Sequence, residues 1–182
     1  MQRALLALGL AAALLAHAAS AAAHVVFAEP QAQGGAYYAG FLRVSHGCGT
    51  SPTISVRVDI PPGVLMARPQ PKPGWRLSVA REPLAEPIPS EGGSITERVV
   101  SITWRGRLPA DQFDQFGVMM KLPAQAGPLY FFVTQTCARG ERSWSQVPAE
   151  GQPWGSVESP APVLTLAAPQ GAAPETSHDH RH

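Results

Sequence analysis

Apolar and polar residues alternate over short stretches of this chain, and Pro or Gly interrupts nearly every stretch. The clearest alternation spans residues 54–60, where the apolar residues would share one face of a strand: Ile54, Val56, Val58 and Ile60. Pro61-Pro62-Gly63 follows and would end the strand. No stretch after residue 23 keeps a helical period long enough to predict a helix.

Similar alternations predict further strands at 25–28, 37–44, 75–81, 99–105, 113–122, 129–137, 142–147 and 163–166. Turn residues separate almost all of them. Many short strands with turns between them are typical of two packed antiparallel sheets. The sequence therefore predicts an all-β fold, an antiparallel two-sheet β-sandwich.

Prolines gather in two clusters that break this pattern. The first precedes Gly74-Trp75, the second lies ten residues further on, and the members are Pro69, Pro71, Pro73, Pro83, Pro87 and Pro89. Because proline has no backbone N–H to donate to a neighbouring strand, we expect both clusters to form ordered surface loops.

The first 23 residues resemble an export signal. Met1-Gln2-Arg3 is a short positive start, an apolar run from Ala4 to Leu15 follows, and Ala21-x-Ala23 is a small-residue cleavage pattern. We therefore expect residues 1–23 to be a signal peptide, 24–167 one β-sandwich domain, and 168–182 a disordered tail containing histidines. The apolar run is too short to span a bilayer, so the mature chain should be periplasmic or secreted, with no membrane span.

Charge and cysteine content narrow the classes of partner. A net charge of +1 gives no reason to expect binding to nucleic acid.

Two cysteines in an exported chain, Cys48 and Cys137, predict one disulfide. Closing a loop of about 90 residues would contribute ~4 to 5 kcal/mol on the chain-entropy model. A copper–thiolate site is the alternative, and it would need both thiols reduced in an oxidising compartment.

Cleavage after Ala23 would leave His24 as the first residue, with a free α-amine beside its imidazole. The amine and Nδ1 of such a residue can close one chelate ring on a metal ion. Nitrogen donors in a tetragonal array suit Cu(II), which binds most tightly among the common divalent ions. His24 is therefore a candidate copper ligand, and a solvated chain end is the alternative interpretation.

Several motifs resemble the YcnI-like family of exported copper-binding domains. They occur in order from His24 to about Leu166: His24-Val25-Val26, Gly34-Gly35-Ala36-Tyr37-Tyr38, the run from His46 to Thr53, Lys72-Pro73-Gly74-Trp75 and Pro160-Ala161-Pro162. The resemblance implies a cupredoxin-like β-sandwich that binds Cu(II) through a single N-terminal histidine. It also implies an acidic side chain and a tryptophan beside the metal.

Two carboxylates are candidates for the acidic ligand. Glu29 lies within reach of the first strand, with Pro30 directly after it, although residues five apart face opposite sides of a regular strand. Some members of the family carry an acid where this chain has Tyr38. Asp114, on another predicted strand, is the second candidate.

Trp144 matches the position of the family's metal-adjacent tryptophan, and a core position is the alternative. An indole over copper would exclude water and offer cation–π attraction. We expect Trp75 and Trp104 to serve the core. His46 could be a further ligand or a structural group beside the disulfide. The tail histidines, His178, His180 and His182, would bind metal weakly.

Three functions are compatible with these residues. The preferred one is a non-enzymatic Cu(II)-binding protein that sequesters copper or passes it to periplasmic copper chaperones or a membrane copper importer. The second is a copper oxidase, although the copper here would have one histidine in its chelate and no flat aromatic substrate platform is evident in the sequence. The third is an adhesion or scaffolding sandwich, in which His24 would have no metal to bind.

Overall fold

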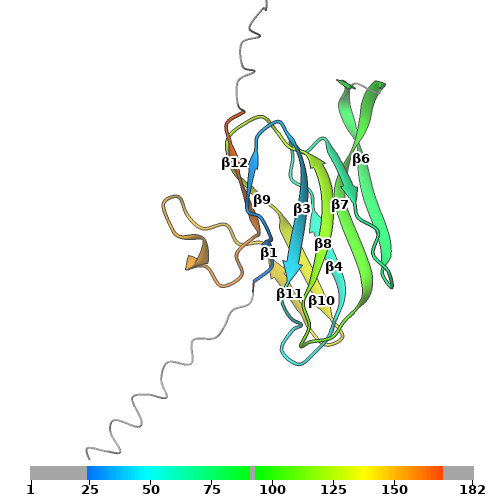
Figure 1. The fold of residues 1–182 in the computed structure, drawn as a ribbon, viewed down its shortest axis with the longest axis vertical. Coiled ribbons are helices and arrows are strands. Elements are labelled where there is room, and N and C mark those ends of the chain that lie inside the picture. Colours follow the sequence, from blue (N-terminus) through cyan, green and yellow to red (C-terminus); the bar gives the residue numbers. More distant parts are fainter. Residues whose placement is uncertain (1–23, 91–92, 170–182) are drawn as a thin grey trace, which may run out of the picture.

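The fold is a sandwich of β-sheets, as the sequence predicts (Figure 1). The computed structural model describes residues 24–90 and 93–169. The expected signal peptide and the tail histidines lie outside these ranges. Within them, no helix is long and apolar enough to cross a membrane.

A four-stranded and a five-stranded antiparallel sheet form the two layers. The first runs in the order β1 (Val26–Phe27), β3 (Tyr37–Val44), β8 (Asp114–Lys121), β5 (Met66–Pro69). The second runs β11 (Glu141–Trp144), β10 (Phe132–Cys137), β4 (Thr53–Asp59), β7 (Gly93–Leu108), β6 (Arg76–Ser90). Their inward residues form one core, in which Trp104 of β7 packs against Phe116 of β8 with ring centroids 5.4 Å apart.

A smaller third sheet closes one side of the sandwich. It consists of β2 (Gln31–Gln33), β12 (Val163–Ala167) and β9 (Gly127–Tyr130), with β2 parallel and β9 antiparallel to β12. Between β11 and β12 the chain forms a long connection with a short 3-10 turn, η2 (Trp154–Ser156). The sequence pattern did not predict β2 or β5.

The alternation predicted for residues 54–60, most of which form β4, is confirmed for three of the four apolar residues. Val56, Val58 and Ile60 are buried, whereas Ile54 is 38% exposed and Thr53 is buried in its place. In the pairing of β4 with β10, Ser55 lies opposite Thr136 and Thr53 opposite Cys137, so β4 has one extra residue at Ile54. Because the side-chain period of a strand is two, an inserted residue turns Ile54 to the outer face.

The second proline cluster corrects a prediction. Pro83, Pro87 and Pro89 lie within β6 and not in a loop. This strand is at the edge of its sheet, where the missing N–H groups face no partner, and its pairing with β7 is interrupted between Pro83 and Ile88. The β6–β7 hairpin extends beyond the rest of the sandwich (Figure 1).

The tryptophans assigned to the core are placed as predicted. Trp104 is fully buried and donates its indole N–H to the carbonyl of Gln70. Trp75 is partly buried against the core, edge-on to Phe116 at 5.0 Å. The Trp75 ring packs closely over Gly106, where a Cβ would lie only 2.4 Å from the ring.

The predicted disulfide between Cys48 and Cys137 is confirmed. It joins the segment before β4 to the end of β10, across 89 residues of sequence. The bond supports an oxidising compartment outside the cytoplasm. It also removes both thiols from the set of possible metal ligands.

We expect the Cys48→Ser/Cys137→Ser variant to lose about 3 to 5 kcal/mol of unfolding free energy, because the unfolded chain regains the entropy of the open loop. Chemical denaturation would measure the loss. As a control, reductant should destabilise the native protein by a similar amount and leave the variant unchanged. Equal denaturation midpoints for the native and variant proteins would contradict this prediction.

Candidate metal centre at His24

His24 lies two residues before β1, the edge strand of the four-stranded sheet. That strand pairs with β3, with Val26 opposite Arg43 and Phe27 opposite Leu42. Val25 and Phe27 are buried in the core, whereas His24 is half-buried. The burial of these two residues secures the start of the domain and places the imidazole of His24 at its surface.

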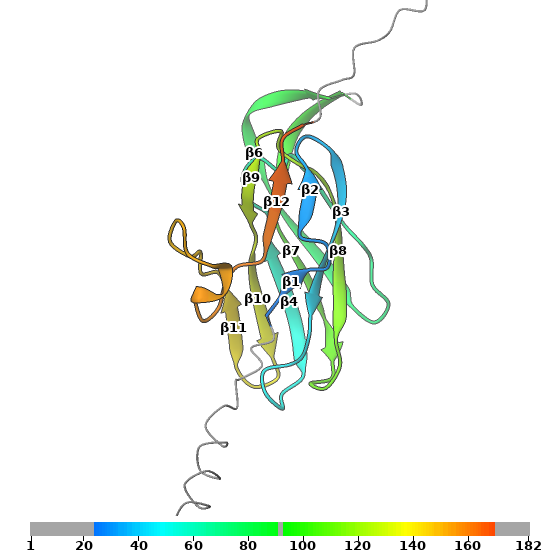
Figure 2. The same cartoon turned by 60° about the vertical axis from the view of Figure 1, so that its left-hand side comes forward.

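Two indole rings flank the imidazole of His24. The ring of Trp144 lies 5.6 Å away between centroids at 69° between planes, and that of Trp154 lies 5.1 Å away at 67°. Both meet His24 edge to face. Figures 1 and 2 show why they can, since the segment after β11, in orange, lies on the side of the sandwich where β1 begins.

Trp144 reaches this place through the β10–β11 hairpin. The hairpin turns at Gly140, whose φ of 85° favours glycine, and pairs Trp144 with Val133. The side chain is 4% exposed, and its N–H donates to Oε1 of Gln135 at 3.2 Å. Trp144 is therefore both a core residue and a neighbour of His24, so the two interpretations made from the sequence are not exclusive.

Gln135 connects Trp144 to the segment around the disulfide. Its Nε2 donates to the carbonyl of His46 at 2.7 Å and to Oγ1 of Thr53 at 2.8 Å. The amide thus uses both of its N–H groups and its oxygen in hydrogen bonds while 3% exposed. These bonds fix the plane of the indole that faces His24.

Trp154 is the site residue that the sequence analysis missed. It lies in η2, and its N–H donates to the carbonyl of Ala161 at 2.7 Å. Backbone hydrogen bonds from Gln146 to Ser159 and from Ala161 to Gln146 join the ends of this connection. A lone tryptophan in an otherwise polar, Gly- and Pro-rich stretch was the available signal, since such a residue usually packs against something.

Glu29 lies in the bend that follows β1. Its backbone carbonyl accepts a hydrogen bond from the hydroxyl of Tyr38, which is itself packed near Phe27. Burial, and next the negative charge of Glu29, raise the pKa of Tyr38. The carboxylate of Glu29 is exposed, and it forms no ion pair within the described ranges.

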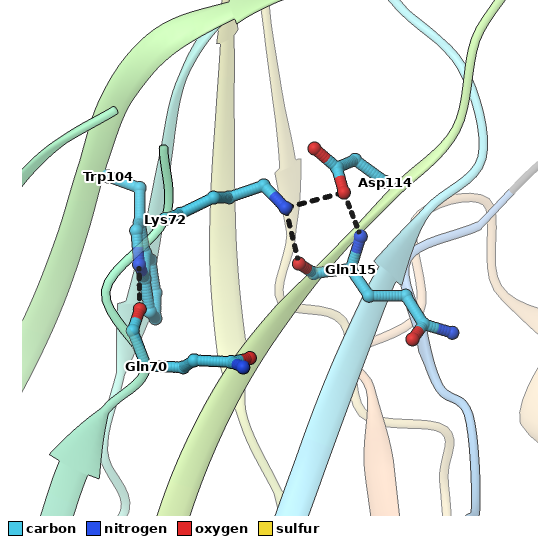
Figure 3. Close-up of polar contacts among 5 residues, drawn as sticks. All are labelled: Gln70, Lys72, Trp104, Asp114 and Gln115. Atoms are coloured by element: carbon cyan, nitrogen blue, oxygen red, sulfur yellow. Dashed lines mark hydrogen bonds and ion pairs between the residues drawn. The ribbon is translucent and has the colours of Figure 1, made fainter. Parts of the chain in front are cut away.

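Asp114 is engaged elsewhere, as Figure 3 shows. Its Oδ1 accepts from Nζ of Lys72 at 2.6 Å and from the backbone N–H of Gln115 at 2.8 Å. Lys72 also donates to the carbonyl of Gln115. Both side chains of this ion pair are partly buried, so releasing the carboxylate to a metal would leave the lysine without its partner.

His46 has a structural role in these contacts. Its Nδ1–H donates to the carbonyl of Gly47, and its own carbonyl accepts the hydrogen bond from Gln135. His178, His180 and His182 lie outside the described residues.

The donors around His24 are few. In residues 24–90 and 93–169, no group of three or more His, Cys, Asp or Glu side chains is placed to hold a metal ion. An ion at His24 would therefore need donors that are not already gathered in such a group. The α-amine that cleavage before His24 would create is such a donor, and with the imidazole it suits Cu(II).

Comparison with known proteins places the chain in a family. A chain of an uncharacterized protein from Nocardia farcinica, whose crystal structure reveals an immunoglobulin-like fold, is 31% identical. The match covers 80% of this chain and 99% of that one, with a TM-score of 0.60. No curated protein matches. The model of a domain of unknown function, DUF1775, matches residues 24–166. The chain therefore belongs to the DUF1775 family, which includes the YcnI-like domains.

Proposed function

We propose that this protein is an exported, non-enzymatic Cu(II)-binding protein of copper trafficking or homeostasis. The observation that carries the proposal is the position of the His24 imidazole between the indoles of Trp144 and Trp154. The protein would exchange copper with a periplasmic copper chaperone or a membrane copper importer. The disulfide is compatible with such a compartment.

His24 would bind the ion through its α-amine and Nδ1, and Glu29 would supply the acidic ligand. Of the two carboxylates considered, Glu29 is exposed and forms no ion pair in the described part of the chain, whereas Asp114 is paired with Lys72. Glu29 lies in the bend that follows β1, five residues after His24. The two indoles would exclude water and attract the cation through their ring faces.

The same enclosure favours a carrier over an oxidase. Oxygen chemistry at copper needs an open coordination position, and here two large side chains crowd the imidazole. The buried hydrogen bond to Gln135 also prevents the ring of Trp144 from turning away without a loss of stability.

Insertion of one Ala between Ala23 and His24 should abolish tight copper binding. After cleavage at the same site, the His24 nitrogen would be an amide, and we expect the Kd for Cu(II) to rise at least about 100-fold, or about 2.7 kcal/mol. Competition with a chelator would measure the Kd while suppressing weak binding by the tail. The matched control is His46→Gln, which should bind as tightly as the native protein. An unchanged Kd in the insertion variant would contradict the site.

Replacement of each carboxylate should separate the two candidate ligands. Glu29→Gln should weaken Cu(II) binding about 10-fold because an anionic oxygen is lost, with little change in stability. Asp114→Asn should instead leave the Kd unchanged and lower stability, because Lys72 loses its partner. The opposite pair of results would make Asp114 the ligand.

Copper should also quench tryptophan fluorescence. Trp144 and Trp154 lie beside His24, whereas Trp75 and Trp104 lie in the core. A Trp144→Phe/Trp154→Phe variant should therefore bind copper with little quenching, while a Trp75→Phe variant should keep the native response.

Peroxide formation with ascorbate should be slow and should rise in Trp144→Phe, since a smaller ring admits water and oxygen. Rapid turnover of a defined substrate by the native protein would favour the oxidase.

A further inference from the structure

A groove of about 480 Å³ opens beside Trp154 and along β1. Its volume falls in the range of small-molecule sites, about 300 to 1,000 Å³. The lining is apolar except for the guanidinium of Arg43. Its apolar part includes Val26, Trp154 and Val163.

The guanidinium of Arg43 forms no ion pair with any of the described residues. On β3 its cross-strand neighbours are Val26 of β1 and Gln115 of β8, and neither is charged. The ion pairs of the described residues involve Arg57, Lys72 and Arg98, and Arg43 is in none of them. A half-buried cation in apolar surroundings keeps much of its electrostatic potential for a ligand.

Two acidic residues that could be considered as partners, Asp114 and Glu29, do not pair with Arg43; Asp114 lies opposite Val44 in the sheet. Asp114 precedes Gln115 but is bound by Lys72, and Glu29 lies next to Tyr38. Arg43 is thus left to recognise an anion from outside, and a carboxylate matches the two parallel N–H groups of a guanidinium.

We propose that this groove binds a small carboxylate with an apolar body, whose carboxylate pairs with Arg43. The body would lie against Val26, Val163 and the indole of Trp154. The indole is already fixed by its hydrogen bond to Ala161, so binding needs no rearrangement of the groove wall.

The groove adjoins the candidate metal centre, because Trp154 contacts His24 and also lines the groove. Val26, opposite Arg43, is two residues from His24. The next step rests on the proposed function. A carboxylate bound to Arg43 would neutralise a positive charge near the copper ion. It should raise Cu(II) affinity roughly two- to fivefold.

The test uses the copper-free protein and 3-phenylpropanoate as the probe. Calorimetry and tryptophan fluorescence should give saturable one-to-one binding with a Kd below about 10 mM. Arg43→Gln should weaken binding about 10-fold or more. Arg81→Gln, an equal loss of charge at an exposed position of β6, should leave it unchanged. The uncharged 3-phenylpropanamide should bind at least about 10-fold more weakly than the acid.

Each contrary result has a separate meaning. Equal binding of acid and amide, no effect of Arg43→Gln, or no binding to about 10 mM would overturn the carboxylate site. Binding through Arg43 with an unchanged Cu(II) Kd would overturn the coupling alone. A protein that binds the acid but no copper would overturn the proposed function and leave the groove as described.

Discussion

The buried amide of Gln135 is the interaction on which the candidate centre depends. One side chain accepts the N–H of Trp144 and donates to His46 and Thr53, so it joins β10, β11 and the segment that carries Cys48. No buried side-chain nitrogen or oxygen in the described ranges lacks a partner, which shows how closely these groups are matched. Replacing the amide with an apolar group would leave the buried N–H of Trp144 without its partner, at a cost of about 1 to 3 kcal/mol.

The centre is assembled where the edges of two sheets meet. β1 ends one sheet and β11 ends the other, and the connection carrying Trp154 covers the space between them. A strand of two residues would have little stability alone. Phe27 of β1 and Val25 before it are buried and tie this strand to the core, with Phe27 packed against Phe131 at 4.9 Å. The half-buried imidazole of His24 is thus supported by the body of the domain.

This arrangement separates stability from function. The disulfide, Trp104 and the Lys72–Asp114 pair stabilise the sandwich, and none of them contacts His24 among the contacts of the described residues. His24, Trp154 and Arg43 lie at one side, where a change of side chain would cost little packing. Family members could therefore differ in ligand preference while retaining the fold, since sites vary more readily than the scaffold that holds them.

The sequence by itself determined the fold class, the disulfide and the core tryptophans, because alternation, cysteine count and aromatic burial are local or compositional signals. It also singled out His24 and Trp144, through the cleavage pattern and the family motifs. Only the tertiary structure decided that Ile54 turns outward at a bulge and that Pro83 can lie in an edge strand. The same holds for Trp154 and Arg43, which meet beside β1 from positions more than a hundred residues apart. Such neighbours depend on the order of strands across a sheet, and no periodicity along the chain encodes that order.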